Sequence, residues 1–258
     1  MKKLTRKLIL AAAITSIFSA VFTSGVAHAE EQKPDNKVSF NAAVTSDYRF
    51  RGISQTRLEP ALQGGADYVH NPSGFYVGTW LSTIKFVKDA GGSGNVEVDV
   101  YGGKRGAITE DVLYDVGVLT YVYPSNDLNP SANTTELYAQ LGYGPAYIKY
   151  SYSVTDLFGY VDSEGSGYLD AGMNLDVGAG FILNLHAGHQ TVKGSNGGVD
   201  NDRFSYTDWK VGVTKDFGIA TGALAVIGSN ADKDAYASPV NAKFMGKTAL
   251  VLTVSKTF

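Results

Sequence analysis

The stretch 38–51 reads Val38-Ser39-Phe40-Asn41-Ala42-Ala43-Val44-Thr45-Ser46-Asp47-Tyr48-Arg49-Phe50-Arg51. Its even positions are mostly apolar or aromatic, whereas its odd positions mostly carry Ser, Asn, Thr, Asp or Arg. Because successive side chains of a β-strand point to opposite faces, this alternation predicts a strand with one apolar and one polar face. The same pattern recurs at 96–101, 136–141, 148–152 and 208–213.

The chain beyond residue 37 divides into about twelve such segments. We expect strands at 38–51, 58–70, 75–84, 95–103, 112–123, 134–142, 146–154, 167–176, 181–191, 205–215, 222–229 and 246–258. Most of them approach the roughly 9–11 residues that a tilted strand needs to cross a bilayer. Connections after even-numbered segments are short, except 104–111, and those after odd-numbered segments are mostly long and rich in Gly, Asn, Asp and Ser. The predicted fold is therefore all-β, a transmembrane antiparallel β-barrel of about twelve strands with short periplasmic turns and longer extracellular loops.

Composition excludes several other classes of protein. The 258 residues include 30 Gly and are 12% aromatic, which favours an all-β fold, and a 44% hydrophobic content is too high for a disordered chain. The mean hydropathy of −0.08, without long apolar runs after residue 30, excludes a helical membrane protein. Because the chain has no Cys, disulfide scaffolds and thiolate metal sites are excluded too.

The first residues have the three parts of a secretory signal. Four basic residues lie within 2–7, an apolar run covers 8–22, and Ala27-His28-Ala29 offers a small-x-small cleavage site. This order predicts a cleaved signal peptide over 1–29, with a retained membrane anchor as the alternative.

The mature chain then consists of a short lead at 30–37 and an outer-membrane barrel at 38–258. Removing four basic residues and no acidic ones changes the formal net charge from −3 to −7. A nucleic-acid partner is not expected, because phosphates require a basic face.

Alternation alone does not separate a membrane barrel from a soluble β-sandwich, whose apolar faces point into a core. The final segment favours the barrel, because Leu250, Leu252, Val254 and Phe258 share one face, interrupted only by Lys256. Pairing with the first strand would leave no edge exposed to lipid. We expect Phe258 to be the signal read by the barrel-assembly machinery.

Aromatic residues lie near the ends of several predicted strands, where membrane barrels carry interfacial girdles. The residues assigned to these girdles are Tyr48, Phe50, Phe75, Phe181 and Phe258.

The segment 45–56, Thr-Ser-Asp-Tyr-Arg-Phe-Arg-Gly-Ile-Ser-Gln-Thr, resembles the opening signature of the TorF-like porin family. The resemblance continues through 63–68, 74–80, 97–102, 121–124 and 255–258 and so spans nearly the whole mature chain. It implies an exported barrel that acts as a porin, with a suggestive link to trimethylamine N-oxide respiration and poorly defined substrates. No catalytic residues come with it.

Residues that could carry chemistry are few. His186 and His189 are three apart on one predicted strand, so they face opposite sides and cannot share a metal. The sequence has no motif typical of a catalytic nucleophile, such as Gly-x-Ser-x-Gly. Residues 200–202 begin like a calcium-binding loop, but the later ligand positions of such a loop are not filled. We therefore expect no enzyme activity, no cofactor and no metal site.

The polar faces of the predicted strands should line the lumen. The pore-lining candidates are Asp47, Arg49, Arg51, Asp67, Glu97, Asp99, Asp115, Glu136, Lys149, Asp170, Asp208 and Lys210. Acids outnumber bases in this set, which predicts a modest preference for cations.

The arginines at 49 and 51 have two interpretations. They select anions or zwitterions, or they brace the wall by pairing with Asp67, Glu97 or Asp99. The segment 51–56 is long enough to fold inward as a constriction, although its length does not require it.

The sequence predicts a narrow outer-membrane channel for passive diffusion of small hydrophilic solutes in a Gram-negative bacterium. Its expected partners are outer-membrane lipid, the barrel-assembly machinery and the solutes, and the oligomeric state stays open. Two alternatives remain: a non-conducting structural or adhesion barrel with partner-binding loops, and a soluble exported β-sandwich that binds a ligand.

Overall fold

The computed structural model describes residues 34–258, so the predicted signal peptide lies outside the described residues. Twelve antiparallel strands close into a barrel in the order β1-β16-β15-β14-β11-β10-β9-β8-β7-β6-β5-β4. The barrel strands are β1 (Asn36–Thr45), β4 (Ala61–His70), β5 (Phe75–Thr83), β6 (Val96–Ala107), β7 (Val112–Val122), β8 (Thr134–Tyr143), β9 (Ala146–Ser153), β10 (Gly167–Gly178), β11 (Phe181–Thr191), β14 (Tyr206–Asp216), β15 (Thr221–Ser229) and β16 (Ala249–Thr257). The prediction of a twelve-stranded antiparallel barrel is confirmed.

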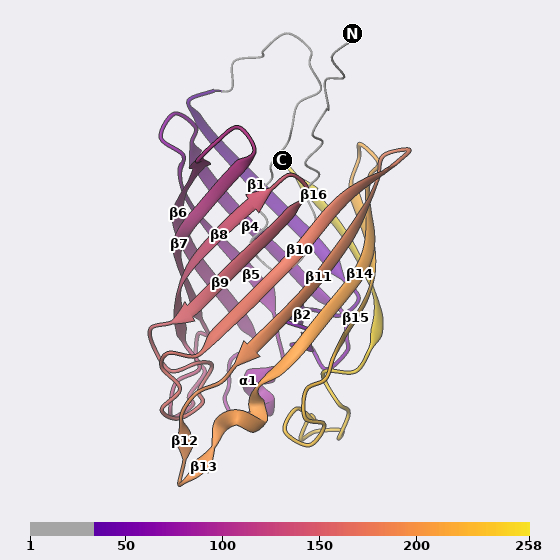
Figure 1. Cartoon of the computed structure of the whole chain (residues 1–258). Coiled ribbons are helices and arrows are strands. Elements are labelled where there is room, and N and C mark those ends of the chain that lie inside the picture. The colour runs from indigo at the N-terminus through magenta and orange to yellow at the C-terminus, as the bar shows by residue number, and fades with distance from the viewer. Residues whose placement is uncertain (1–33) are drawn as a thin grey trace, which may run out of the picture.

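The barrel has a turn end and a loop end (Figure 1). The turn end carries the short connections 71–74, 108–111, 144–145, 179–180 and 217–220. The loop end carries the long connections together with the short elements α1 (Phe86–Asp89), β12 (Ser195–Asn196), β13 (Val199–Asp200) and η1 (Asn201–Phe204). Within residues 34–258, no helix has the length and apolar character needed to cross a membrane.

The two ends of the described chain form the seam of the barrel. Strand β1 pairs with β16 from Asn41↔Thr257 to Thr45↔Thr253. The main chain of Phe258 continues this ladder, because its N–H donates to the Phe40 carbonyl at 2.8 Å and its carbonyl accepts from the Phe40 N–H at 3.1 Å. The terminal residue therefore closes the sheet.

The apolar face of each strand points outward. Val38, Phe40 and Leu250 are 60%, 58% and 63% exposed, whereas inward Ala43 and Thr45 are both 4% exposed. This arrangement is the reverse of a soluble sandwich and is that of a barrel surrounded by lipid. The fold is therefore that of an outer-membrane barrel, as the alternation and closing strand predicted.

Two strand boundaries differ from the prediction by four residues or more. The first strand ends at Thr45 rather than 51, because the chain leaves the wall there and turns back at Arg51 and Gly52, whose φ angles are +46° and +78°. Strand β6 runs to Ala107 rather than 103, which shortens the anomalous predicted connection 104–111 to an ordinary turn.

Aromatic rings on the inner wall pack over glycines of neighbouring strands. A Cβ atom placed on Gly188 would lie 2.0 Å from the Tyr168 Oη, and one on Gly172 would lie 2.5 Å from the Tyr147 ring. These glycines therefore provide the space that the inward tyrosines occupy along the wall.

Candidate functional site

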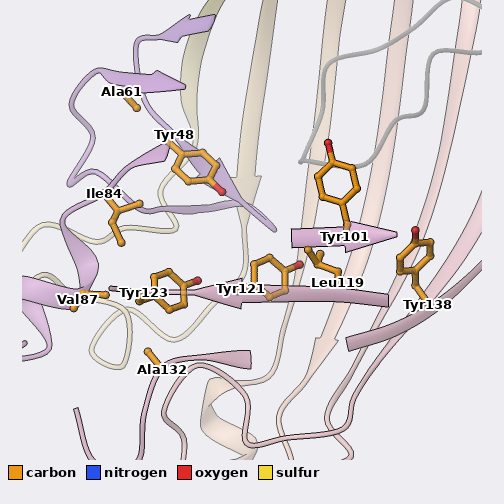
Figure 2. Close-up of a cluster of buried hydrophobic side chains, with 10 residues drawn as sticks. All are labelled: Tyr48, Ala61, Ile84, Val87, Tyr101, Leu119, Tyr121, Tyr123, Ala132 and Tyr138. Carbon is orange, nitrogen blue, oxygen red and sulfur yellow. The ribbon is translucent and has the colours of Figure 1, made fainter. Parts of the chain in front are cut away.

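The segment 46–60, here called the plug loop, fills much of the loop end of the lumen. Its two short strands, β2 (Arg49–Phe50) and β3 (Ile53–Ser54), pair as a small hairpin. Tyr48 is 4% exposed and joins the cluster formed with Tyr121 and Tyr123 of the β7 side of the wall (Figure 2). Segment 51–56 thus folds inward, as its length allowed, and the inward segment begins earlier than expected, at residue 46.

The first anchor of the plug loop is Glu97 on β6. The Tyr48 hydroxyl donates to Glu97 Oε1 at 2.5 Å, and the Tyr123 hydroxyl donates to Oε2 at 2.7 Å. Glu97 is only 1% exposed, so these two hydroxyls take the place of water around its carboxylate.

The second anchor is an ion pair between Arg51 and Glu136 on β8. Arg51 Nη2 lies 2.9 and 2.6 Å from the two carboxylate oxygens, and Nη1 donates to the Gln190 side chain at 2.6 Å. The guanidinium also lies 4.3 Å from the centre of the Tyr168 ring. Both charged side chains are at most 5% exposed, so the plug loop is tied to β8 and β11 inside the lumen.

The third anchor involves Arg49. Its Nε donates to Asp47 at 2.5 Å within the plug loop. Its Nη1 donates to the main-chain carbonyls of Met245 and Lys247, at 3.1 and 3.0 Å, just before β16. The Ser54 N–H also donates to the Met245 carbonyl at 3.0 Å. The plug loop therefore spans the lumen, from β6 and β8 to the segment preceding β16.

These contacts correct the predicted bracing partners. The predicted partners were Asp67, Glu97 or Asp99, whereas the arginines pair with Asp47 and Glu136. The prediction was wrong because it placed the arginines on the wall, while a loop that crosses the lumen carries them to its far side.

The predicted aromatic girdle is correct only at the turn end. Phe75, Phe181 and Phe258 are 56%, 39% and 68% exposed there. Tyr48 and Phe50 lie inside the lumen instead; Phe50 packs edge-on against Tyr121 with ring centres 5.4 Å apart.

The remaining predicted lumen residues lie on the inner face of the wall, and most carboxylates there have hydroxyl or amide partners. Asp67 accepts from Tyr101 at 2.6 Å and from Asn41 at 2.8 Å. Asp115 accepts from Tyr76 at 2.6 Å. Asp99 differs, because it is fully buried and neither carboxylate oxygen has a hydrogen-bond partner within residues 34–258.

Strands β9 to β14 carry a second polar network. His186 bridges Asp170 and Asp208, with Nδ1 and Nε2 at 2.9 and 2.8 Å from the respective carboxylates. Lys149 stands opposite Asp170 in the strand register, and Lys210 stands opposite His186. Positive groups therefore gather on this side, interleaved with acids.

Three features of the lumen were missed from the sequence. Arg105 faces inward opposite Asp115, because β6 extends past the predicted strand end. His186 was expected to be an isolated wall or interface histidine rather than part of a network, and the inward tyrosines were noted only as members of the alternation. Extending the alternation at 97–101 by four residues would have found Arg105.

The two histidines of β11 lie on opposite faces, as predicted. His186 faces the lumen, whereas His189 is exposed on the outside, where its Nδ1 lies 3.0 Å from the Thr207 hydroxyl. In the part of the chain that the structure describes, no three His, Asp or Glu side chains are grouped to hold a metal ion.

Strands β15, β16 and β1 form a neutral arc, defined here by their inward residues, which are small or uncharged. These residues are Thr221, Ala223, Ala225, Ile227, Ser229, Ala249, Val251, Thr253, Ser255, Thr257, Ser39, Asn41, Ala43 and Thr45. Lys37, near the turn end of β1, is charged and shares this face. The other inward charges of the wall lie on the remaining strands, here called the charged arc. Ala225, Thr253 and Ser255 are half-buried, whereas Glu97 and Asp208 on the charged arc are almost fully buried. Solvent therefore reaches the lumen wall unevenly: it is excluded around Glu97 and Asp208 and reaches Ala225, Thr253 and Ser255.

Solved membrane barrels show limited likeness to this chain. The outer membrane protein OprD of Pseudomonas aeruginosa has a TM-score of 0.38 and 9% identity, with 86% of this chain and 64% of OprD covered. OccAB2 of Acinetobacter baumannii has a TM-score of 0.39 and 9% identity, with 88% of this chain and 65% of OccAB2 covered. A triple mutant of the Rh. blastica porin has a TM-score of 0.37 and 8% identity, with 76% of this chain and 55% of the porin covered. This chain thus spans less than two thirds of each of these three proteins.

The search of curated proteins found no match to this chain. A family described as "Bacterial protein of unknown function (Gcw_chp)" matches residues 29–258. Because the match covers nearly all of the chain, this protein belongs to the Gcw_chp family.

Proposed function

We propose that this protein is a narrow passive channel for small hydrophilic solutes in the outer membrane of a Gram-negative bacterium. The observation that carries the proposal is the neutral arc: inside a closed barrel, a strip of uncharged inward residues, most of them half-buried, lies opposite strands whose Glu97 and Asp208 are almost fully buried. Small side chains leave room for solvent, and the charged side chains across the lumen set the local electrostatic potential. We infer that solutes pass off-centre, along β15, β16 and β1.

The plug loop narrows this path at the loop end. Arg49 and Arg51 are held by Asp47 and Glu136, so their charges are largely compensated within the protein. Bracing is therefore their main role in this proposal, and contact with an anionic solute is secondary. The pore-lining role of the predicted inward residues follows from the same proposal.

Single-cysteine variants test the path, because the natural chain has no Cys. Ala225→Cys and Thr253→Cys place a thiol on the neutral arc, and Ser151→Cys places one on the inner face of the charged arc, where Ser151 is 4% exposed. In planar bilayers, a charged methanethiosulfonate reagent should lower conductance in the first two variants and leave Ser151→Cys nearly unchanged. Equal labelling at all three positions would contradict an off-centre path.

A non-conducting structural or adhesion barrel is the second candidate. It is favoured by the plug loop, whose buried anchors reach Glu97, Glu136 and Met245 on different sides of the lumen. A folded barrel that conducts only after deletion of 47–56 would support this candidate over an open channel.

Two further parts of the proposal rest on the sequence. Export through a cleaved signal peptide at 1–29, with 30–37 as a short lead, fits the compartment that a membrane barrel requires. Phe258 would present the assembly signal at the seam. The family description does not name TorF-like porins, so membership of that narrower group remains part of this proposal, as does the absence of enzyme activity.

A further inference from the structure

A cavity of about 370 Å³ lies at the loop end, between the plug loop and the connection 84–95. It is lined by Arg57, Thr83, Ile84, Lys85, Lys88 and Asn95. Three of these side chains are cationic and none is a carboxylate. The cavity surface is mainly apolar, so these cationic groups are the features that would hold a small anion there.

Two acids, Asp89 and Glu59, form ion pairs with cations of this cavity. Arg57 Nε donates to the Asp89 carboxylate at 2.6 and 2.8 Å, and Lys85 forms an ion pair with Glu59. The hydrogen bond from Lys85 lowers the pKa of Glu59 below its ordinary value, so this pair is charged at neutral pH. Lys88 is exposed and forms no ion pair with any residue between 34 and 258. The group thus carries one more positive charge than negative.

The same ion pairs fasten the plug loop to its surroundings. Arg57 and Glu59 belong to the plug loop, whereas Asp89 and Lys85 belong to the connection 84–95. The Ser238 hydroxyl of the last long connection also donates to Asp89, at 3.3 Å. Arg57 and Leu58 have φ angles of +57° and +67°, a left-handed conformation that costs energy in residues other than glycine. These contacts therefore hold a strained part of the plug loop in place.

We propose that this cavity binds a small anionic group, a carboxylate or a phosphate, and that the bound anion loosens the plug loop. An anion among the three cations would compete with Asp89 for Arg57 and with Glu59 for Lys85. The weakened ion pairs would then allow the strained segment at 57–58 to relax. The binding part of the proposal stands by itself, whereas the effect on conductance rests on the proposed channel function.

Binding is tested with inorganic phosphate and the folded full-length protein in a zwitterionic detergent, followed by ³¹P NMR and titration calorimetry. Lys88→Ser should weaken phosphate binding about tenfold, because it removes one charge-assisted contact. Arg57→Ser should weaken it by a similar factor. Lys233→Ser is the matched control: it removes an exposed cation from another loop, outside the cavity, and should bind as the wild type does. Heat-modified mobility on gels verifies that each variant is folded.

The effect on the plug loop is tested in phospholipid bilayers without lipopolysaccharide. Phosphate added at the loop end should raise mean conductance more than chloride of equal ionic strength, and Lys88→Ser should need more phosphate for the same rise. A parallel series with lipid A separates the two sources of the anion. A rise that appears only with lipid A assigns the site to a lipid phosphate, and a rise with free phosphate alone assigns it to a solute.

Equal phosphate affinity in the wild type, Lys88→Ser and Arg57→Ser would overturn the site, whether or not the barrel conducts. If the variants weaken phosphate binding as expected, but phosphate does not change the conductance of a conducting channel, the proposed coupling to the plug loop is wrong. A barrel that binds phosphate as expected but never conducts would overturn the proposed function and leave the site standing.

Discussion

Removing the guanidinium of Arg51 should destabilise the protein strongly. In Arg51→Ser, the Glu136 carboxylate would remain almost fully buried without its counter-charge, and Gln190 would lose a hydrogen bond of 2.6 Å. Breaking a buried ion pair by deleting one partner typically costs about 3–5 kcal/mol. We therefore expect the free energy of unfolding to fall by about that amount.

The double variant Arg51→Ser with Glu136→Gln isolates the cause of this loss. A neutral amide is cheaper to bury than an unpaired carboxylate, so the second change should restore about 2 kcal/mol of the loss. Lys233→Ser, which removes an exposed loop cation, serves as the control and should change stability by less than about 0.5 kcal/mol.

Urea unfolding in phospholipid vesicles measures these differences, with fluorescence from Trp80 and Trp209 as the signal. Planar-bilayer recordings on the same samples should show larger conductance for Arg51→Ser, because the plug loop loses its anchor to β8. If the double variant were as unstable as the single one, the unpaired carboxylate would not be the source of the loss. A single variant of wild-type stability and conductance would remove Arg51 from the account of the plug loop.

Four further predictions concern assembly, orientation, packing and selectivity. Deletion of Phe258 should lower the amount of heat-modifiable folded barrel in outer-membrane fractions, because its main chain completes the seam; wild-type yield would contradict this. An epitope inserted between Gly197 and Gly198 should be labelled on intact cells and one within 71–74 should not, whereas the opposite result would reverse the orientation. Gly188→Ala should cost about 1–3 kcal/mol, because its Cβ would collide with the tyrosine ring packed over it, and Gly142→Ala, with no atom closer than 3.8 Å, should be nearly neutral in the same urea assay. Reversal potentials should show a modest cation preference at low salt that fades at 1 M, where the screening length is about 3 Å; anion preference at low salt would refute the excess of acidic lumen charge.

The barrel could be predicted from the sequence because lipid imposes a simple rule on it. Most outward positions are apolar, so Val38, Phe40 and Val44 reveal the strand and its facing without knowledge of its partners. The order of neighbours then follows from short turns between adjacent antiparallel strands. Inward residues such as Glu97 and Asp208 follow from the same alternation.

The plug loop was only partly predictable, because alternation at 46–51 continues after the strand has ended. Tyr48 and Arg49 keep the pattern of β1, yet they lie in a hairpin that crosses the lumen. The ion-pair partners depend on which strands lie opposite this hairpin, and the local sequence does not contain that information. Arg51 meets Glu136 across 85 positions of the chain.

The contacts of the plug loop also constrain the order in which the protein can be assembled. Its Arg49 and Ser54 are bonded to the carbonyl of Met245, which lies just before the last strand. These bonds to Met245 can therefore form only when almost the entire remaining chain is present. The bonds from Arg49 and Ser54 to Met245 are thus among the late, long-range contacts that slow the folding of such a topology.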